Sequence, residues 1–98
     1  MGIRNSTFGS VANDATLVQG VQMDLVAGGT FVGTIELQVA IPDASGANVW
    51  VKVGSLTAPG AITYMAGTQR SFRAACTAWT SGTIVYSLAG LFLEDHVW

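Results

Sequence analysis

The chain has 98 residues, enough for one domain near the lower end of the size that supports a hydrophobic core. Half of the residues are apolar and only 10% are charged, against about 25% in an ordinary soluble domain, and the formal net charge is -2. The four basic residues are too few and too scattered for nucleic acid, and no apolar run approaches the roughly 18 to 20 residues that span a bilayer. So few charges indicate instead that another chain covers part of the surface.

Residues 1–14 are small and polar and show no periodicity. They predict an extended N-terminal arm that precedes a folded domain of residues 15–98. An arm of this kind becomes ordered when it binds a partner, and a plain disordered tail is an equal alternative. The partner contacts expected here are Ile3, Phe8 and Val11 as apolar anchors and Arg4 as a charged contact.

Residues 15–27 alternate loosely between apolar and polar, and Gly28 and Gly29 then predict a turn. The core positions expected in this first strand are Leu17, Val21, Met23 and Leu25.

Residues 31–41 alternate strictly, which is typical of a strand with one face in a core. Gly33 falls on the inward side, where a missing side chain indicates a bulge or a close neighbour. The positions expected to face the core are Phe31, Ile35, Leu37, Val39 and Ile41, and those expected to face outward are Thr34, Glu36 and Gln38.

The second half of the chain continues as strands and turns, beginning with the loop "PDASGAN". Residues 49–56 allow two registers, one with the valines inward and one with Trp50 inward, so that both faces of this strand could be covered. Further strands are expected at 62–66, 70–79 and 83–93, with Phe72, Ala74, Cys76 and Ala78 on one face and with Ile84, Tyr86 and Leu88 in phase. Six or seven short strands without a helical period predict an all-β fold, an antiparallel β-sandwich (Ig-like or jelly-roll-like) or a small barrel.

Residues that could perform chemistry are sparse. The only histidine, His96, lies three residues from the end of the sequence, and the only cysteine, Cys76, is expected as a small buried hydrophobe. Glu94 and His96 could share one side of a strand, but two ligands do not complete a metal site. We therefore expect no catalytic, metal-binding or cofactor-binding residues, and a non-enzymatic protein. A small hydrolase would have to depend on His96.

Two further sets of residues are candidates for binding. The C-terminal apolar segment, residues 90–98, either completes the core of its own domain or docks on a neighbouring subunit through Leu91, Phe92, Leu93, Val97 and Trp98. As an alternative, Trp50, Tyr64 and Trp79 could stack on sugar rings and bind a glycan.

Two stretches of the sequence, "GTFVGTIELQVAIPDASGANVWVKVGSLTAPG" and "FRAACTAWTSGTIVYSLAG", resemble small bacteriophage virion proteins. The resemblance covers residues 29–90, and the loop "PDASGANVW" is longer than the compact Asp-Gly-Gly turn of that group, so no calcium or sugar role is carried over. The matching positions are Phe31, Gly33, Thr34, Ile35, Leu37, Gln38, Trp50, Phe72, Arg73, Thr80, Ser81, Gly82 and Thr83.

The resemblance implies a capsid decoration (cement) protein or another structural part of the virion, with no catalytic residues. Its partner would be the major capsid protein or another virion protein, and its location the capsid surface after synthesis in the host cytoplasm. We expect a homo-oligomer, with a trimer as the first expectation because decoration must match the symmetry of the lattice. The alternative is a tail or fibre module that binds host-surface glycans.

Overall fold

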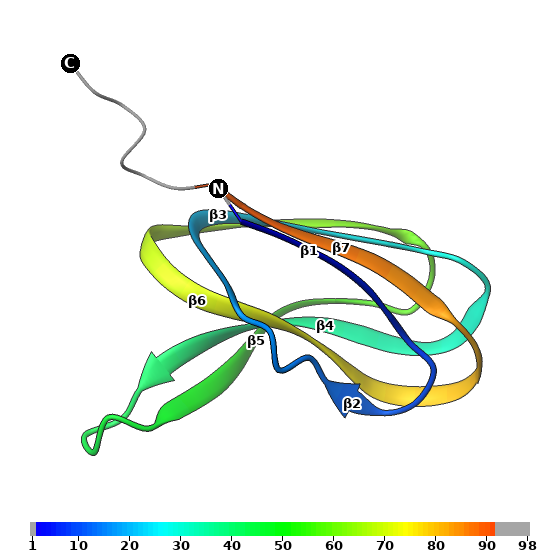
Figure 1. Cartoon of the computed structure of the whole chain (residues 1–98), viewed down its shortest axis with the longest axis horizontal. Helices are drawn as coiled ribbons and strands as arrows, with labels where there is room; N and C mark the ends of the chain where they lie inside the picture. The colour runs from blue at the N-terminus through cyan, green and yellow to red at the C-terminus, as the bar shows by residue number, and fades with distance from the viewer. Residues whose placement is uncertain (1, 92–98) are drawn as a thin grey trace.

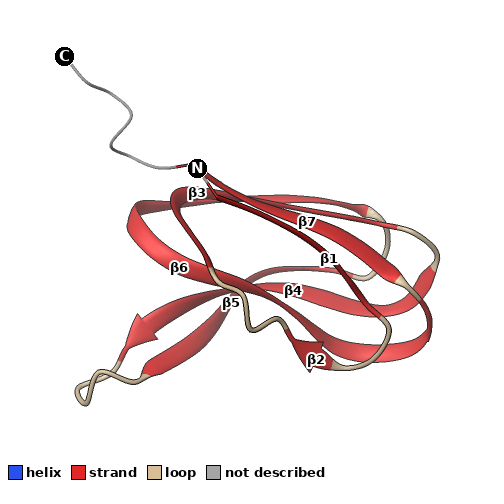
Figure 2. Ribbon diagram, viewed as in Figure 1, coloured by secondary structure: helices blue, strands red, loops and turns tan. Residues whose placement is uncertain are grey.

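The computed structural model describes residues 2–91, and this part of the chain consists of β-strands joined by short turns, without a helix (Figure 2). All pairings are antiparallel, so the predicted all-β antiparallel class is confirmed. Among residues 2–91 no helix is long and apolar enough to cross a membrane. The strands are β1 (Gly2–Phe8), β2 (Ala12–Asn13), β3 (Val18–Gly28), β4 (Phe31–Pro42), β5 (Asn48–Leu56), β6 (Gly60–Gly82) and β7 (Ile84–Leu91).

The strands belong to one hydrogen-bonded sheet with the order β1-β7-β3-β6-β4-β5 (Figure 1). β1 pairs with β7 at one edge, yet β2, which follows only a few residues later, pairs with β6 in the middle of the order. The sheet therefore curls back on itself, and its two edges do not lie at opposite ends of a flat layer. β6 makes this possible because its first part pairs with β3 and its last part pairs with β4.

The strand β6 differs from the prediction of short strands, since it is 23 residues long and includes both segments expected at 62–66 and 70–79. Gly67 lies between them with a φ of 81°, a conformation that is unstrained only for glycine. The register with β3 shifts in the same region, between Gly20 and Gln22. This irregularity bends β6 without ending it.

The core lies inside the curled sheet and takes side chains from five strands. Alternate residues point inward, as predicted for the strands that carry Ile35 and Leu37 and for the strand that carries Ile84 and Leu88, all of which are fully buried. The buried apolar cluster is Phe8, Val18, Met23, Leu25, Ala27, Ile35, Leu37, Val39, Phe72, Ala74, Cys76, Ile84, Tyr86 and Leu88.

Three expected core positions differ from the structure. Leu17 precedes β3 and is exposed, and Val18 is buried in its place; Val21 is only half-buried because the register shift after Gly20 changes the phase of β3. Ile41 is 43% exposed, since the end of β4 extends beyond the core.

The prediction of a bulge or a close neighbour at Gly33 is confirmed. The pairing of β4 with β6 shifts register between Val32 and Gly33, and a Cβ atom on Gly33 would lie 2.4 Å from the carbonyl oxygen of Ala78. The close approach of the two backbones therefore requires glycine here.

The N-terminal segment is part of the sheet and not an arm that precedes it. Residues 2–8 form β1 and pair with β7 along its whole length, from Gly2 opposite Gly90 to Phe8 opposite Ile84. Phe8 is buried and stacks on Tyr86, with ring centroids 4.9 Å apart. The prediction of an arm was wrong because it relied on the polar composition of these residues. One face of β1 is solvent-exposed and the other packs on the polar end of the core, so polar residues are compatible with a strand here.

Candidate interaction surfaces

A buried polar cluster ties β1 to the rest of the domain. The Arg4 Nε donates to Asp14 Oδ2 at 2.8 Å, and the Thr16 amide donates to Asp14 Oδ1 at 3.0 Å. The Tyr86 hydroxyl donates to the same carboxylate from inside the core. Asp14 is only 8% exposed and is the only charged side chain buried to this degree among the described residues.

The ionisation of this cluster follows from its burial and its hydrogen bonds. Burial opposes the charge of Asp14, but the hydrogen bonds from Arg4, Tyr86 and Thr16 together outweigh it and lower the pKa of the carboxyl group. Burial, assisted by the neighbouring carboxylate, raises the pKa of Tyr86 to about 12. Arg4 is thus engaged within its own chain, and Phe8 lies in the core, so neither matches the partner contact expected of it.

One exposed apolar surface is the outer side of β1, β7, β3 and the first part of β6, which we call the four-strand face. The strand registers place its residues in rows, for example Asn5 beside Ser87, Val26 and Ala61. The other rows are Ile3, Ala89, Asp24 and Thr63; Thr7, Val85 and Gly28; and Leu91, Gln22 and Met65.

The four-strand face is nearly free of charge and rich in exposed apolar side chains. Asp24 is its only ionisable residue, and one of its carboxylate oxygens is buried without a hydrogen-bond partner among residues 2–91. Its large apolar side chains are between 42% and 67% exposed, and they are Ile3, Val26, Met65, Val85 and Leu91. Ile3 and Leu91 were predicted as partner contacts, whereas the other three were not.

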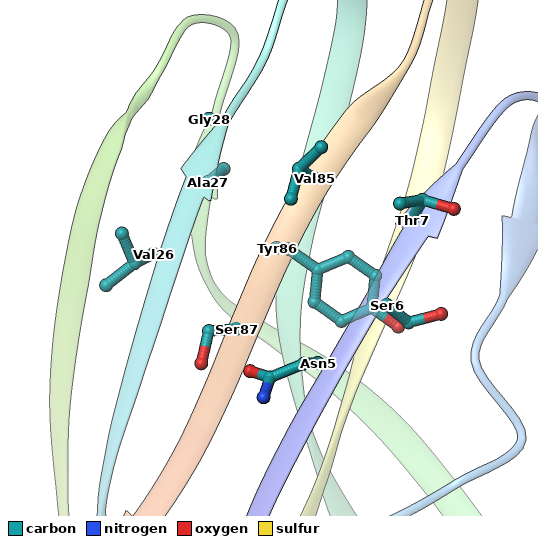
Figure 3. Close-up of a pocket in the computed structure, with 9 residues that line it drawn as sticks. All are labelled: Asn5, Ser6, Thr7, Val26, Ala27, Gly28, Val85, Tyr86 and Ser87. Atoms are coloured by element: carbon teal, nitrogen blue, oxygen red, sulfur yellow. The ribbon is translucent and has the colours of Figure 1, made fainter.

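A shallow groove of about 490 Å³ crosses the four-strand face where the side chains are short (Figure 3). Val26 and Val85 stand on β3 and β7 at its sides, and Gly28 and Ser87 leave the space between them. The groove continues to β1, where Asn5 and Thr7 add polar atoms. This shape can receive an apolar side chain from another molecule.

A second exposed apolar surface is carried by the β4–β5 hairpin, which projects from the curled body of the protein (Figure 1). Ile41, Val49 and Val51 are 43%, 49% and 39% exposed. Ile41 is paired with Val49 and Val39 with Val51, so these side chains continue the inward-facing rows of β4 and β5 beyond the core. The hairpin loop is held by Asp43, whose carboxylate accepts hydrogen bonds from the amides of Ser45 and Ala47.

The register left open for residues 49–56 is decided by this hairpin. Val53 packs against the core, whereas Trp50 lies on the opposite face, half-buried, with the Arg73 guanidinium 4.2 Å from its ring centroid. Arg73 also donates to Gln38 Oε1 at 2.7 Å. The valines therefore point to the core side, and those nearest the loop extend past the core.

The three aromatic residues proposed for glycan stacking do not form one platform. Tyr64 packs against the core beside Phe72, and Arg73 covers one face of Trp50. Trp79 is 37% exposed and its Nε1 donates to the carbonyl of Gly82.

The remaining site predictions concern Cys76, the other expected contacts and the C-terminal residues. Cys76 is buried, as expected, and burial raises the pKa of its thiol. Val11 is 61% exposed and lies outside the four-strand face. Among residues 2–91 no group of three His, Cys, Asp or Glu side chains could hold a metal ion. Six of the residues considered above lie outside the described residues, namely Phe92, Leu93, Glu94, His96, Val97 and Trp98.

The two surfaces thus rest on the residues and registers of this chain alone. No family model, no curated protein and no solved structure matches the chain.

Proposed function

We propose that the protein is a non-enzymatic structural protein of a virion, a head decoration protein that uses the four-strand face to bind the capsid lattice. The observation that carries this proposal is the combination of exposed apolar side chains with a single ionisable residue on that face. Exposed apolar surfaces of this kind are typical of protein–protein contacts. The identity of the partner rests on the resemblance of residues 29–90 to phage virion proteins.

The chemistry of the face indicates what the partner must present. Val26 and Val85 flank a groove that accepts an apolar side chain, and Asp24 is the only ionisable residue of the face. A capsid surface that presents an apolar side chain and few charges would match this face.

The size of the face favours binding in many copies. Four strands spaced about 4.8 Å apart and about six residue steps of about 3.4 Å give an area of roughly 400 Å². A stable pairwise interface buries about 800 Å² on each partner. One copy should therefore bind weakly alone, and contacts to several capsomers, or contacts between copies, would add the missing affinity.

Co-sedimentation with capsid shells tests the proposal. The shells are assembled from the major capsid protein encoded in the same genome, and the bound fraction of this protein is measured in the pellet. We expect saturable binding that Val26→Lys and Val85→Lys each weaken at least tenfold, since burying a valine contributes about 1.5–3 kcal/mol. The matched control is Val32→Lys, a valine 58% exposed on β4, which should bind as the unmodified protein does.

The results that would overturn the proposal are equally direct. Absence of binding to the shells, or an equal loss in all three variants, would contradict a role for this face in decoration. Selective binding on a glycan array that Trp79→Ala abolishes would support the tail or fibre alternative instead.

A further inference from the structure

We propose that two copies of the chain pair through the free edge of β5, antiparallel, about a two-fold axis at Val51. This inference does not rest on the proposed function, because it uses the hairpin and not the four-strand face. β5 is the last strand in the sheet order, so within residues 2–91 it is hydrogen-bonded to β4 on one side only. Its other edge presents backbone N–H and C=O groups that a strand from another chain can bind.

The side chains near this edge indicate that the edge is covered. Val49 and Val51 are 49% and 39% exposed, and Ile41 beside them is 43% exposed. Val51 lies opposite Val39, which belongs to the core, and Val49 lies opposite Ile41. A strand added at this edge, with its own apolar face on the same side, would extend the core across the junction.

The sequence of β5 supplies such a strand, because its apolar positions are symmetric. In "VWVKV" the valines lie at 49, 51 and 53. Antiparallel pairing centred on Val51 places Val49 opposite Val53 of the second copy and Val51 opposite its own equivalent. All the valines of both strands then face one another on one side of the joined sheet, where cross-strand β-branched pairs are favourable.

Charge selects this register over its neighbours. The only charged residue of β5 is Lys52, which lies on the opposite side from the valines. Pairing centred on Lys52 would place two ammonium groups opposite each other, which is unfavourable. Pairing centred on Val51 instead places Lys52 opposite Trp50 of the second copy. Pairing centred on Trp50 would leave Val53 opposite Ala47 and so match one valine fewer.

The occupant is therefore a second copy of this chain, and the resulting unit is a two-fold dimer and not the trimer first expected. Residues 48–52 of β5 pair regularly with β4, and the register shift lies at Val53, because Leu37 is opposite Gly54 and Gln38 is opposite Lys52. The axis at Val51 therefore lies in the regular part of β5, and Val53 lies at its boundary. The hairpin projects from the body, so that two curled sheets can approach edge to edge (Figure 1).

Cysteine cross-linking of the full chain tests both the contact and its register. Residues at the axis of an antiparallel pair have Cα atoms about 4.5–5.5 Å apart, a distance that a disulfide can bridge. Val49 and its equivalent would be separated by about four residue steps, roughly 13 Å, which a disulfide cannot bridge. Val51→Cys should therefore form covalent dimers in a glutathione redox buffer at least tenfold faster than Val49→Cys. Val85→Cys, on the four-strand face, is the second control, and the buried Cys76 remains in all three variants.

Sedimentation equilibrium of the unmodified protein provides the second measurement. We expect a concentration-dependent mass that approaches twice 10.2 kDa, and a Val51→Lys variant whose dimer dissociation constant is raised at least tenfold. The matched Val26→Lys variant should leave that constant unchanged.

A protein that stays monomeric in sedimentation would overturn the inference, as would disulfide formation by Val51→Cys no faster than by the two controls. The variants of the four-strand face (Val26, Val85) and the variant of the β5 edge (Val51) change different residues. In the unmodified protein, absence of capsid binding with intact dimers would contradict only the proposed function, and absence of dimers with intact capsid binding would contradict only this inference.

Discussion

Replacing Asp14 should destabilise the domain more than any other single change of a charged residue among those described. Asp14→Ala removes the acceptor of the Arg4, Thr16 and Tyr86 hydrogen bonds at once. The largest loss is the Tyr86 hydroxyl, which is left in the core without an acceptor at a cost of about 1–3 kcal/mol. The amide bond of Thr16 adds about 0.5–1.5 kcal/mol.

The ion pair with Arg4 contributes less, because the Arg4 side chain is 36% exposed and solvent screens it. Together these losses lower the free energy of unfolding by roughly 3 kcal/mol. In a domain of this size that corresponds to a decrease in Tm of about 10 to 25 °C.

Urea denaturation followed by tryptophan fluorescence measures this change. Tyr86→Phe keeps the stacking on Phe8 and removes only the hydroxyl, so the double-mutant cycle of Asp14→Asn with Tyr86→Phe should give a coupling of about 1–2 kcal/mol. The control is Glu36→Gln, whose carboxylate contacts only Gln38 and Thr77 on the outer side and which should change stability by less than about 0.5 kcal/mol.

The reasoning would be refuted if Asp14→Ala were as stable as the unmodified protein. That result would mean that this carboxylate does not help to fasten residues 2–14 to the domain.

Three further predictions concern single residues. Tyr86 has a pKa of about 12 in the folded protein and about 10 in the unfolded chain. The stability that its protonated hydroxyl contributes is therefore complete below pH 10 and is lost as the pH rises to 12, so that the free energy of unfolding should fall by roughly 2 to 3 kcal/mol across this range. Tyr86→Phe should abolish that part of the decrease. Gly33→Ala should destabilise the protein by about 1–3 kcal/mol in urea denaturation, because the added Cβ would collide with the Ala78 carbonyl. Gly28→Ala is the control, since Gly28 has open space around it and the change should be neutral or slightly stabilising. Equal effects of the two changes would contradict the close approach of β4 and β6. Cys76 should react with iodoacetamide only in denaturant, as followed by mass spectrometry, because its thiol is 1% exposed; rapid labelling of the native protein would show that the core opens.

The candidate surfaces were only partly predictable. Ile3 and Leu91 stood out as apolar residues near the two ends of the sequence, and the structure places both on the four-strand face. Val26, Met65 and Val85 gave no such signal, since an apolar residue within a strand is as compatible with the core as with the surface. Phe8 and Arg4 were expected at a partner and lie instead in the domain's own core and polar cluster.

The amino-acid sequence by itself determined the all-β class, the positions of β3, β4, β5 and β7, and most of the inward-facing residues, because alternation with period two is a local property that follows from backbone geometry. It also indicated a bulge or a close neighbour at Gly33 for the same reason. The tertiary structure alone decided which strands pair, where β6 bends, and that residues 2–8 form the edge strand β1, since these depend on contacts between segments far apart in the chain. Periodicity states which side chains share a face of a strand. Only the arrangement of the strands decides how far the core reaches along that face, and so which of its valines, such as Val49 and Val51, remain exposed.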